Sequence, residues 1–287
     1  MQFTEQKTQQ TVNIRGVDHY YRWIRQGEGD THKPVLVFVH GWGGSSRYWE
    51  TTAQAFAPQF DCLLYDLRGF GRSRLPDSLP TTSYEMGEYV EDLAIFLDQL
   101  GLETVYLNGH SVGASIATLF TSRYPQRVEK LILTCSGVFA YNPITFPAFH
   151  KAGTVVVKLR YNWFLKVPLA GRLFMARFVH RALEDQINRE FLEDYLEADY
   201  EAAVGTIYTA VSQQAAQEMP EAFASLDVPT LLVAGKEDII IPTKLAKRAV
   251  SLNPETVQYV EIPNTAHFPM LEDRETYDQA VQEFLNG

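Results

Sequence analysis

The chain has 287 residues, of which 46% are hydrophobic and 21% are charged, so it can bury a large core and lacks the composition of a disordered protein. Asp and Glu number 35 against 25 Lys and Arg, which gives a formal net charge of -10. An acidic chain neutralises phosphates poorly, so we expect no nucleic-acid partner.

The N-terminus and the cysteines indicate the compartment. The first ten residues, MQFTEQKTQQ, contain no apolar core of the kind found in secretory signals. No uncharged apolar run reaches the ~18 residues that a membrane-spanning helix needs. Cys62 and Cys135 stand in apolar runs, so we interpret them as buried thiols and expect neither a disulfide nor a metal site. Together these features predict a reduced, cytoplasmic protein.

The N-terminal part alternates apolar runs with polar or glycine-containing turns, which is typical of strands. The run that begins at Pro34 is continuously apolar, as expected for a strand buried on both faces. We predict a hairpin of Thr11–Arg15 and His19–Arg25 around Gly16, a polar turn at Gly27–Lys33, strands at Pro34–His40 and Cys62–Asp66, and a helix at Trp49–Ala57.

From Ser83 the apolar residues recur at helical spacing as far as Leu100, and Gly101 marks a C-terminal stop. Beyond this helix, strands and helices alternate, which favours a parallel sheet with helices on both faces. The predicted elements are a strand at Thr104–Leu107, a helix at Val112–Tyr124 and a strand at Lys130–Cys135.

The alternation stops between Gly137 and about Phe223, where the pattern is helical, most clearly over Leu183–Tyr200. It resumes with strands at Pro229–Ala234 and Val257–Ile262 and helices at Thr243–Ser251 and about Arg274–Leu285. We therefore expect a core domain of residues 1–136 and 224–287, interrupted by a helical insertion of residues 137–223.

The segment Gly109–Gly113 fits the pattern G-x-S-x-G, between a predicted strand and a predicted helix. This is the context of a nucleophile elbow, in which Ser111 takes a strained backbone at a sharp strand-to-helix turn. The motif alone is also compatible with a glycine-rich turn capped by serine, but its place in the chain favours the elbow.

A serine nucleophile needs a base and a group that orients the base. Asp238 and His267 each follow a predicted strand, so they should lie at the same sheet edge as Ser111. The order serine, aspartate, histidine is that of the α/β-hydrolases. Glu237 competes for the role of the acid, and we favour Asp238 because it fits G-x-x-D four residues before Pro242. His110 should point away from the serine.

The loop His40-Gly41-Trp42-Gly43-Gly44 follows a buried strand. Acyl transfer requires N–H donors aimed at the developing oxyanion. We expect these donors to be the amides of Trp42 and Val112. Alone, the loop would be better interpreted as a flexible turn.

These motifs resemble the α/β-hydrolase superfamily over nearly the whole chain, together with a D-x-R-G-x-G-x-S segment at Asp66–Ser73. The resemblance implies a mostly parallel, twisted eight-stranded sheet flanked by helices, and it implies that residues 137–223 form a cap over the site. Within Asp66–Ser73, Gly69 and Gly71 should make the turn and Arg68 should form an ion pair. The expected motif or structural residues are His40, Gly41, Gly43, Gly109, His110, Gly113, Asp66, Arg68, Gly69 and Gly71.

The resemblance also implies an activity. Epoxide hydrolases and haloalkane dehalogenases of the superfamily have aspartate at the nucleophile position, so Ser111 favours attack on a carbonyl carbon. We expect an esterase- or lipase-like serine hydrolase that acts on a small, apolar acyl substrate without a metal or cofactor. C–C bond hydrolases, thioesterases, perhydrolases and acyltransferases share this triad, and a ligand receptor of the same fold is a further alternative.

The expected cap is unusual in charge. From Gly137 to Glu190 it has eight Lys and Arg against three acids, interleaved with aromatic residues. Such a segment can contact an anionic membrane or steer an anionic substrate. Alternatively, the aromatic residues pack the cap or line the pocket while the basic groups stay solvated, and this is the interpretation that we favour.

Overall fold

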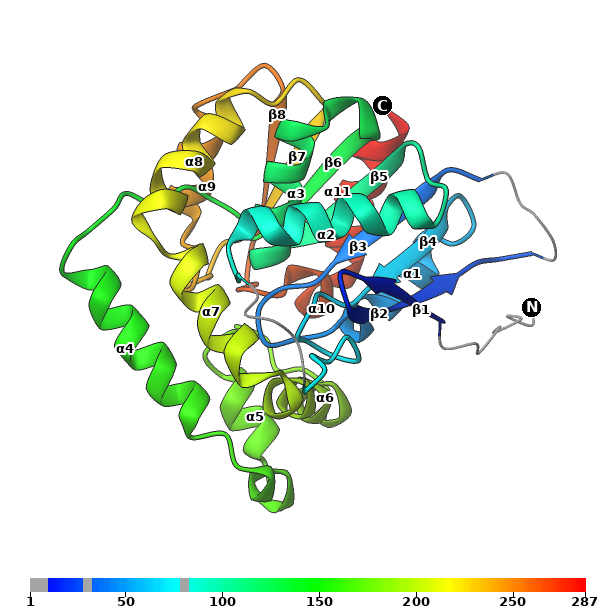
Figure 1. Ribbon diagram of the computed structural model, residues 1–287. Helices are drawn as coiled ribbons and strands as arrows, with labels where there is room; N and C mark the ends of the chain where they lie inside the picture. The colour runs from blue at the N-terminus through cyan, green and yellow to red at the C-terminus, as the bar shows by residue number, and fades with distance from the viewer. Residues whose placement is uncertain (1–9, 28–32, 78–82) are drawn as a thin grey trace.

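The computed structural model describes residues 10–27, 33–77 and 83–287. The polar N-terminus and most of the turn expected at Gly27–Lys33 lie outside these residues. Eight strands form one sheet in the order β1-β2-β4-β3-β5-β6-β7-β8 (Figure 1). The strands are β1 Gln10–Ile14, β2 Val17–Ile24, β3 Val35–Val39, β4 Asp61–Tyr65, β5 Val105–His110, β6 Val128–Thr134, β7 Thr230–Gly235 and β8 Val257–Ile262.

The sheet is mostly parallel, as predicted. β2 runs antiparallel to both β1 and β4, and the other neighbouring strands are parallel. The helices that flank it are α1 Glu50–Phe56, α2 Met86–Gln99, α3 Val112–Arg123, α9 Thr243–Val250 and α11 Arg274–Asn286.

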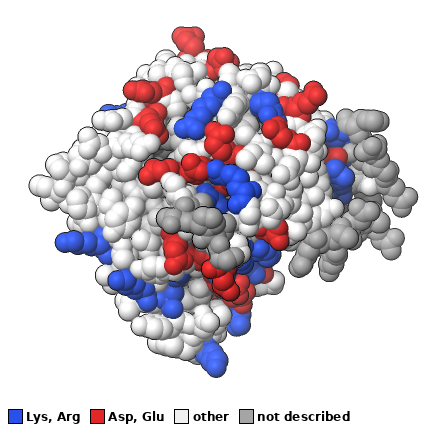
Figure 2. All heavy atoms as spheres, viewed as in Figure 1, with Lys and Arg blue, Asp and Glu red and all other residues white. Residues whose placement is uncertain are grey.

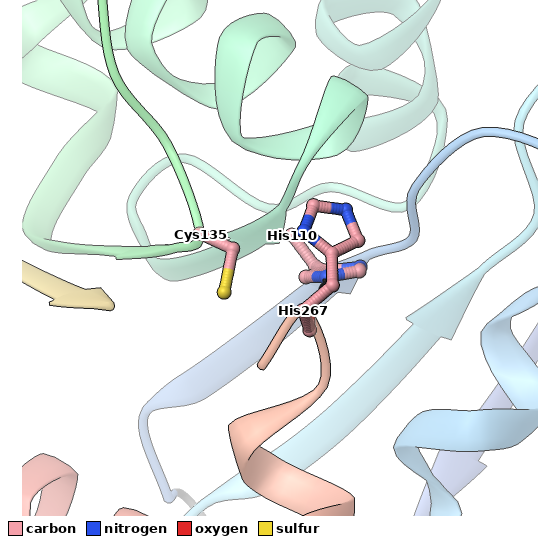
Figure 3. Close-up of side chains that lie close together, drawn as sticks. All are labelled: His110, Cys135 and His267. Carbon is pink, nitrogen blue, oxygen red and sulfur yellow. Dashed lines mark hydrogen bonds between the residues drawn. The ribbon is translucent and has the colours of Figure 1, made fainter. Parts of the chain in front are cut away.

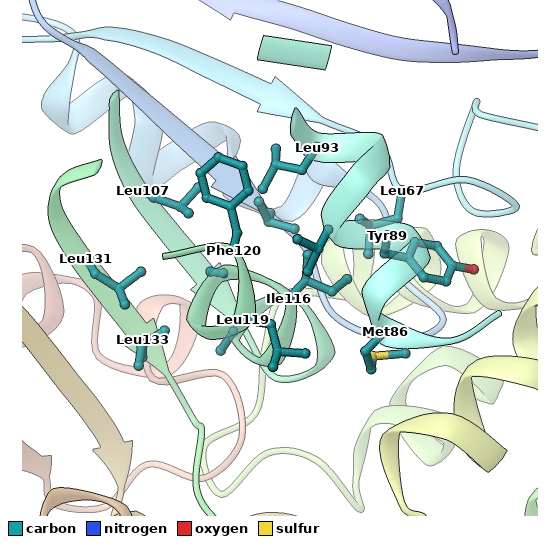
Figure 4. Close-up of a cluster of buried hydrophobic side chains, with 14 of the residues drawn as sticks. Leu67, Met86, Tyr89, Leu93, Leu107, Ile116, Leu119, Phe120, Leu131 and Leu133 are labelled. Atoms are coloured by element: carbon teal, nitrogen blue, oxygen red, sulfur yellow. The ribbon is translucent and has the colours of Figure 1, made fainter. Parts of the chain in front are cut away.

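Strand β3 explains why both faces of the sheet are covered. Its alternate side chains point to opposite faces. Val37 and Val39 pack in the cluster that includes α2 and α3, whereas Leu36 and Phe38 pack in the cluster that includes α1 and α11. Figure 4 shows the first cluster, in which Phe120 of α3 lies among leucines of the strands and of α2.

Three local features differ from the sequence-based prediction. β5 extends to His110, so Gly109 belongs to the strand and the turn follows at once. A 3-10 helix, η1 Ser46–Trp49, precedes α1, and a second, η2 Pro125–Arg127, follows α3. The short helix α10, Pro269–Glu272, begins two residues after His267 and has too few residues to show a period.

Between β6 and β7 the chain is helical and contains no strand, all of it within the described residues. The helix expected at Leu183–Tyr200 ends at Glu197, and another begins at Tyr200. The helices are α4 Thr145–Lys158, η3 Asn162–Lys166, α5 Ala170–Met175, α6 Asp185–Glu197, α7 Tyr200–Ala210 and α8 Gln213–Ala224. In Figure 1, α4 to α7 lie at the left and bottom of the molecule, whereas α8 lies at the upper left, where it packs on α3.

None of the helices in the described part of the chain has both the length and the apolar character needed to cross a bilayer.

Candidate active site

Ser111 occupies the turn between β5 and α3 with φ 55° and ψ -117°, a conformation that non-glycine residues rarely adopt. Such a residue costs on the order of 1–3 kcal/mol and persists where the surroundings hold it. The glycines around it are required by close packing. A Cβ added to Gly113 would lie 2.4 Å from the carbonyl oxygen of His40, and one added to Gly109 would lie 2.5 Å from that of Gly113. The sequence therefore builds the elbow geometry here.

The structure brings Ser111, His267 and Asp238 together. His267 Nε2 lies 3.0 Å from Ser111 Oγ, and His267 Nδ1 lies 2.7 Å from Asp238 Oδ2. With a neutral ring, the Nδ1–H donates to the carboxylate and Nε2 is left as an acceptor for the serine hydroxyl. Ser111 is partly exposed, whereas Asp238 and His267 are buried. This arrangement can move a proton away from Oγ.

Asp238 is held by backbone amides. Its Oδ1 accepts hydrogen bonds from the amides of Ile240 and Ile241 at 2.7 and 3.0 Å, which leaves Oδ2 for His267. The side chain of Glu237, the competing acid, is exposed to solvent. Of the two acids, Asp238 is therefore the one in contact with the imidazole.

His110 forms hydrogen bonds with Tyr48 and with the backbone of His267, and none with Ser111 among the described contacts. Its Nε2 lies 2.8 Å from the His267 carbonyl oxygen, and its Nδ1 lies 2.8 Å from the Tyr48 hydroxyl. Burial, together with the nearby His267, lowers the pKa of His110 well below its usual value, so the ring stays neutral. Because a carbonyl only accepts, Nε2 carries the proton and Nδ1 accepts from Tyr48.

Tyr48 extends this series of hydrogen bonds to the glycine loop. Its hydroxyl accepts from the Gly41 amide at 2.6 Å, while it donates to His110. Sequence reasoning missed Tyr48, because nothing in the spacing of a helix-forming segment relates it to residues about sixty positions away.

The loop after β3 lies against the serine. A Cβ added to Gly41 would lie 3.1 Å from Ser111 Cβ, and Gly43 has φ +70°. The buried ring of His40 holds the loop in place through both of its nitrogens. Nδ1 lies 2.8 Å from the Gly41 carbonyl oxygen, and Nε2 accepts a hydrogen bond from the Leu67 amide at 2.9 Å. Burial lowers the pKa of His40, which favours this neutral form.

The amides of Trp42 and Val112 donate no hydrogen bond to any residue that the structure describes. Val112 is the first residue of α3, where backbone N–H groups are left unpaired by helix geometry. The indole of Trp42 is engaged, since its Nε1 donates to the Ala203 carbonyl oxygen of α7 at 2.8 Å. Both amides remain available to an oxyanion.

The Asp66–Ser73 loop has structural contacts. Asp66 accepts from the amides of Ser46 and Arg72 at 2.8 and 2.9 Å. The ion pair expected of Arg68 is made with Asp92, 2.8 Å from Nε to Oδ2. Gly69 and Gly71 both have positive φ, +81° and +54°, as the turn requires.

Glu272 of α10 is a buried acid that sequence reasoning did not identify. Its Oε1 accepts from the amides of Ala266 and Phe268, the two neighbours of His267, at 2.9 and 3.3 Å. Its Oε2 accepts from the amides of His180 and Arg181 in the loop between α5 and α6, at 2.6 and 2.9 Å. One carboxylate thus joins the loop that carries His267, which we call the histidine loop, to the helical insertion.

His110, Cys135 and His267 form a cluster whose donor atoms all lie within 4.8 Å of one another (Figure 3). The Cys135 thiol donates to the Ala266 carbonyl oxygen at 3.7 Å, and the ring nitrogens are bonded as described above. Burial raises the pKa of Cys135 well above its usual value, which opposes the thiolate that a metal would need. These residues fit a hydrogen-bond network better than a metal centre.

Known proteins are similar to this chain in sequence and in fold. Residues 34–274 match the alpha/beta hydrolase fold family. A (lyso)-N-acylphosphatidylethanolamine lipase of Mus musculus is 27% identical over 88% of this chain and 79% of its own length, and a pimeloyl-[acyl-carrier protein] methyl ester esterase of Vibrio campbellii is 25% identical over 91% and 97%. A hydrolase structure from Pseudomonas aeruginosa superposes with a TM-score of 0.80 at 20% identity, covering 98% of this chain and 100% of that one. The chain belongs to the alpha/beta hydrolase fold family, as its sheet order and its strand-to-helix serine turn indicate.

Proposed function

We propose that the protein is a serine hydrolase that cleaves a carboxylic ester or a related acyl substrate through an acyl-enzyme. One observation carries the proposal: His267 lies within hydrogen-bond distance of both Ser111 Oγ, at 3.0 Å, and Asp238 Oδ2, at 2.7 Å. Two relatives named as a lipase and as a methyl ester esterase support the same reaction class.

The geometry suggests the following steps. Ser111 Oγ attacks the carbonyl carbon as its proton passes to His267 Nε2, and Asp238 stabilises the imidazolium. The amides of Trp42 and Val112 hold the oxyanion. When the intermediate collapses, the leaving group takes the proton from Nε2 and the acyl group stays on Ser111. A water molecule then repeats the sequence, with His267 as its base, and releases the acid.

We further propose that residues 137–223 act as a cap on a core formed by residues 1–136 and 224–287. The uninterrupted helical stretch between β6 and β7 supports this division, and hydrogen bonds near the site support a cap that is seated on the core. The His267 amide donates to the Phe178 carbonyl oxygen at 2.8 Å, and the Trp42 indole donates to Ala203. The ring of Tyr195 lies 5.7 Å from that of Trp42, so the cap places aromatic surface next to the oxyanion loop, which suits an apolar acyl group.

Covalent labelling with a fluorophosphonate probe tests the nucleophile. Ser111→Ala should abolish labelling and ester hydrolysis, because no other serine in the described part of the chain forms a hydrogen bond with the His267 ring. Ser115→Ala, one turn further along α3 and also partly exposed, is the matched control and should keep both. Labelling that persists in Ser111→Ala would place the nucleophile elsewhere.

A substrate panel separates the alternatives on the same triad. Rapid turnover of p-nitrophenyl esters would support esterase activity, whereas preference for thioesters or for C–C bonded diketones would redirect the assignment. Slow turnover combined with a ligand-dependent change in Tm would favour a receptor.

A further inference from the structure

The first half of the helical insertion exposes an apolar surface. Of the fifteen large hydrophobic side chains that are exposed in the described residues, eleven lie between Tyr141 and Leu173. Ile144 is 80% exposed and Leu173 is 75% exposed. Soluble proteins rarely leave such side chains together, so a concentration of them points to a binding surface. We call this surface, formed by α4 and residues 161–173, the cap face.

Helix α4 shows that this exposure is patterned. One side of the helix packs on α7, where Val157 is buried and a Cβ added to Gly153 would lie 2.9 Å from Ile207. Ile144, Val155 and Leu159 recur at the spacing of the opposite side and are all exposed. In Figure 1, α4 lies at the outer left of the molecule, away from the sheet.

Among Asp, Glu, Lys and Arg, the cap face itself has only the basic residues, although Arg172 is ion-paired with Asp185 of α6. No Asp or Glu occurs between Glu129 and Glu184, although the whole chain has a net charge of -10. Lys151, Lys158 and Lys166 are exposed and have no ion-pair partner among the described residues. Figure 2 shows Lys and Arg side chains along the lower left of the molecule, where Figure 1 places α4 and α5.

We propose that the cap face docks on an anionic lipid bilayer. The exposed apolar side chains of α4 and of residues 161–173 enter the interface, and the three lysines contact the headgroup phosphates. Charge decides between possible partners: a second copy of the chain would bring two acid-free basic faces together, which is repulsive, whereas an anionic bilayer supplies the opposite charge. This docking does not depend on the proposed esterase chemistry.

Flotation of the full-length protein with vesicles tests the proposal. The protein should float with vesicles of phosphatidylcholine and phosphatidylserine, and much less with vesicles of phosphatidylcholine alone or in high salt. Lys151→Glu/Lys158→Glu should weaken binding to the anionic vesicles about tenfold or more. Ile144→Ser/Leu173→Ser should weaken binding to a similar extent while Tm is unchanged, because these side chains make few intramolecular contacts.

Matched changes outside the cap face provide the control. Lys244→Glu and Leu252→Ser alter an exposed lysine of α9 and an exposed leucine just after it, both outside the cap face, and both variants should bind as the wild type does. Trp163 offers a direct readout, since it is 56% exposed and is the one exposed tryptophan of the four. Its fluorescence should shift to the blue on anionic vesicles, and Trp163→Phe should remove the shift.

Three outcomes would overturn the proposal. The first is a wild type that does not float with anionic vesicles. The second is binding that survives both double variants. The third is a dimer in solution that Ile144→Ser/Leu173→Ser converts to a monomer without any vesicle binding, which would assign the cap face to self-association.

Discussion

The two acids Glu237 and Asp238 are adjacent in sequence but differ in environment. Asp238 is buried, with Oδ1 held by two backbone amides and Oδ2 bonded to His267, whereas Glu237 is exposed. If Oδ1 keeps its amide donors in Asp238→Asn, the new NH2 group faces His267 Nδ1. That nitrogen must then accept, so the proton moves to Nε2 and blocks proton transfer from Ser111.

We therefore predict that Asp238→Asn lowers kcat on the order of 10⁴-fold, as expected for a wrong imidazole tautomer, with little change in Tm. Glu237→Gln is the matched control and should stay within about twofold of the wild type, because its side chain is solvated. Steady-state kinetics on a p-nitrophenyl ester measure both. Equal losses in the two variants would contradict the assignment.

At the scale of elements, the histidine loop is fixed by parts that are distant in sequence. Glu272 of α10 bonds the amides on either side of His267 and two amides of the insertion, and the Phe178 carbonyl oxygen accepts from the His267 amide itself. One carboxylate thus connects the helical insertion with the loop that carries His267.

Glu272→Gln should therefore lower kcat more than it raises KM. An amide NH2 cannot accept the hydrogen bonds that one carboxylate oxygen now accepts, so His267 loses part of its support, and small misplacements cost on the order of 10- to 100-fold in rate. Glu275→Gln, an exposed acid on α11, is the control. The kcat values are measured well below the unfolding temperatures of the wild type and of Glu272→Gln. A fall in Tm with unchanged kcat would then show that Glu272 has only a structural role.

Distance along the chain explains which site residues could be predicted from the sequence. Ser111, Asp238 and His267 each follow a strand within a few residues, so local pattern placed them at one sheet edge. Tyr48 and Glu272 bond backbone amides of the site loops, and Phe178 contributes its carbonyl oxygen, so these contacts carry no sequence signature; the bond of Tyr48 to His110 joins residues distant in sequence. The short helices between Asn162 and Met175 also lack the two turns that periodicity needs.

At the scale of the whole molecule, charge is divided along the chain. The net charge of -10 is an average over the chain, because the acids are absent from residues 130–183. Long-range attraction can then orient the molecule on an anionic surface with the cap face toward it, even though the molecule as a whole is acidic.

Buried neutral histidines make the stability of the whole molecule depend on pH. Burial, with the nearby Arg68 and Arg15, lowers the pKa of His19 to about 3, and burial also lowers the pKa values of His40 and His110. In the unfolded chain these groups titrate near 6.5. Below that pH the unfolded chain binds more protons than the folded chain, so the free energy of unfolding falls as pH falls from about 6.5 toward 3.

His19→Gln tests this effect. For a shift from 6.5 to about 3, His19 alone should remove roughly 2 kcal/mol of stability at pH 5 compared with pH 8. Burial raises the pKa values of Asp194 and Asp278 to about 6, which gives a pH dependence of opposite sign, but both proteins carry these acids, so their effect cancels in the comparison. The Tyr65 hydroxyl lies 2.8 Å from His19 Nδ1, and His19→Gln removes this contact. Chemical denaturation of both proteins at pH 8 measures the free energy of unfolding that is lost for this reason alone. The loss of stability from pH 8 to pH 5 should then be smaller in His19→Gln by about 2 kcal/mol, and an equal loss in both proteins would show that His19 is protonated within the fold.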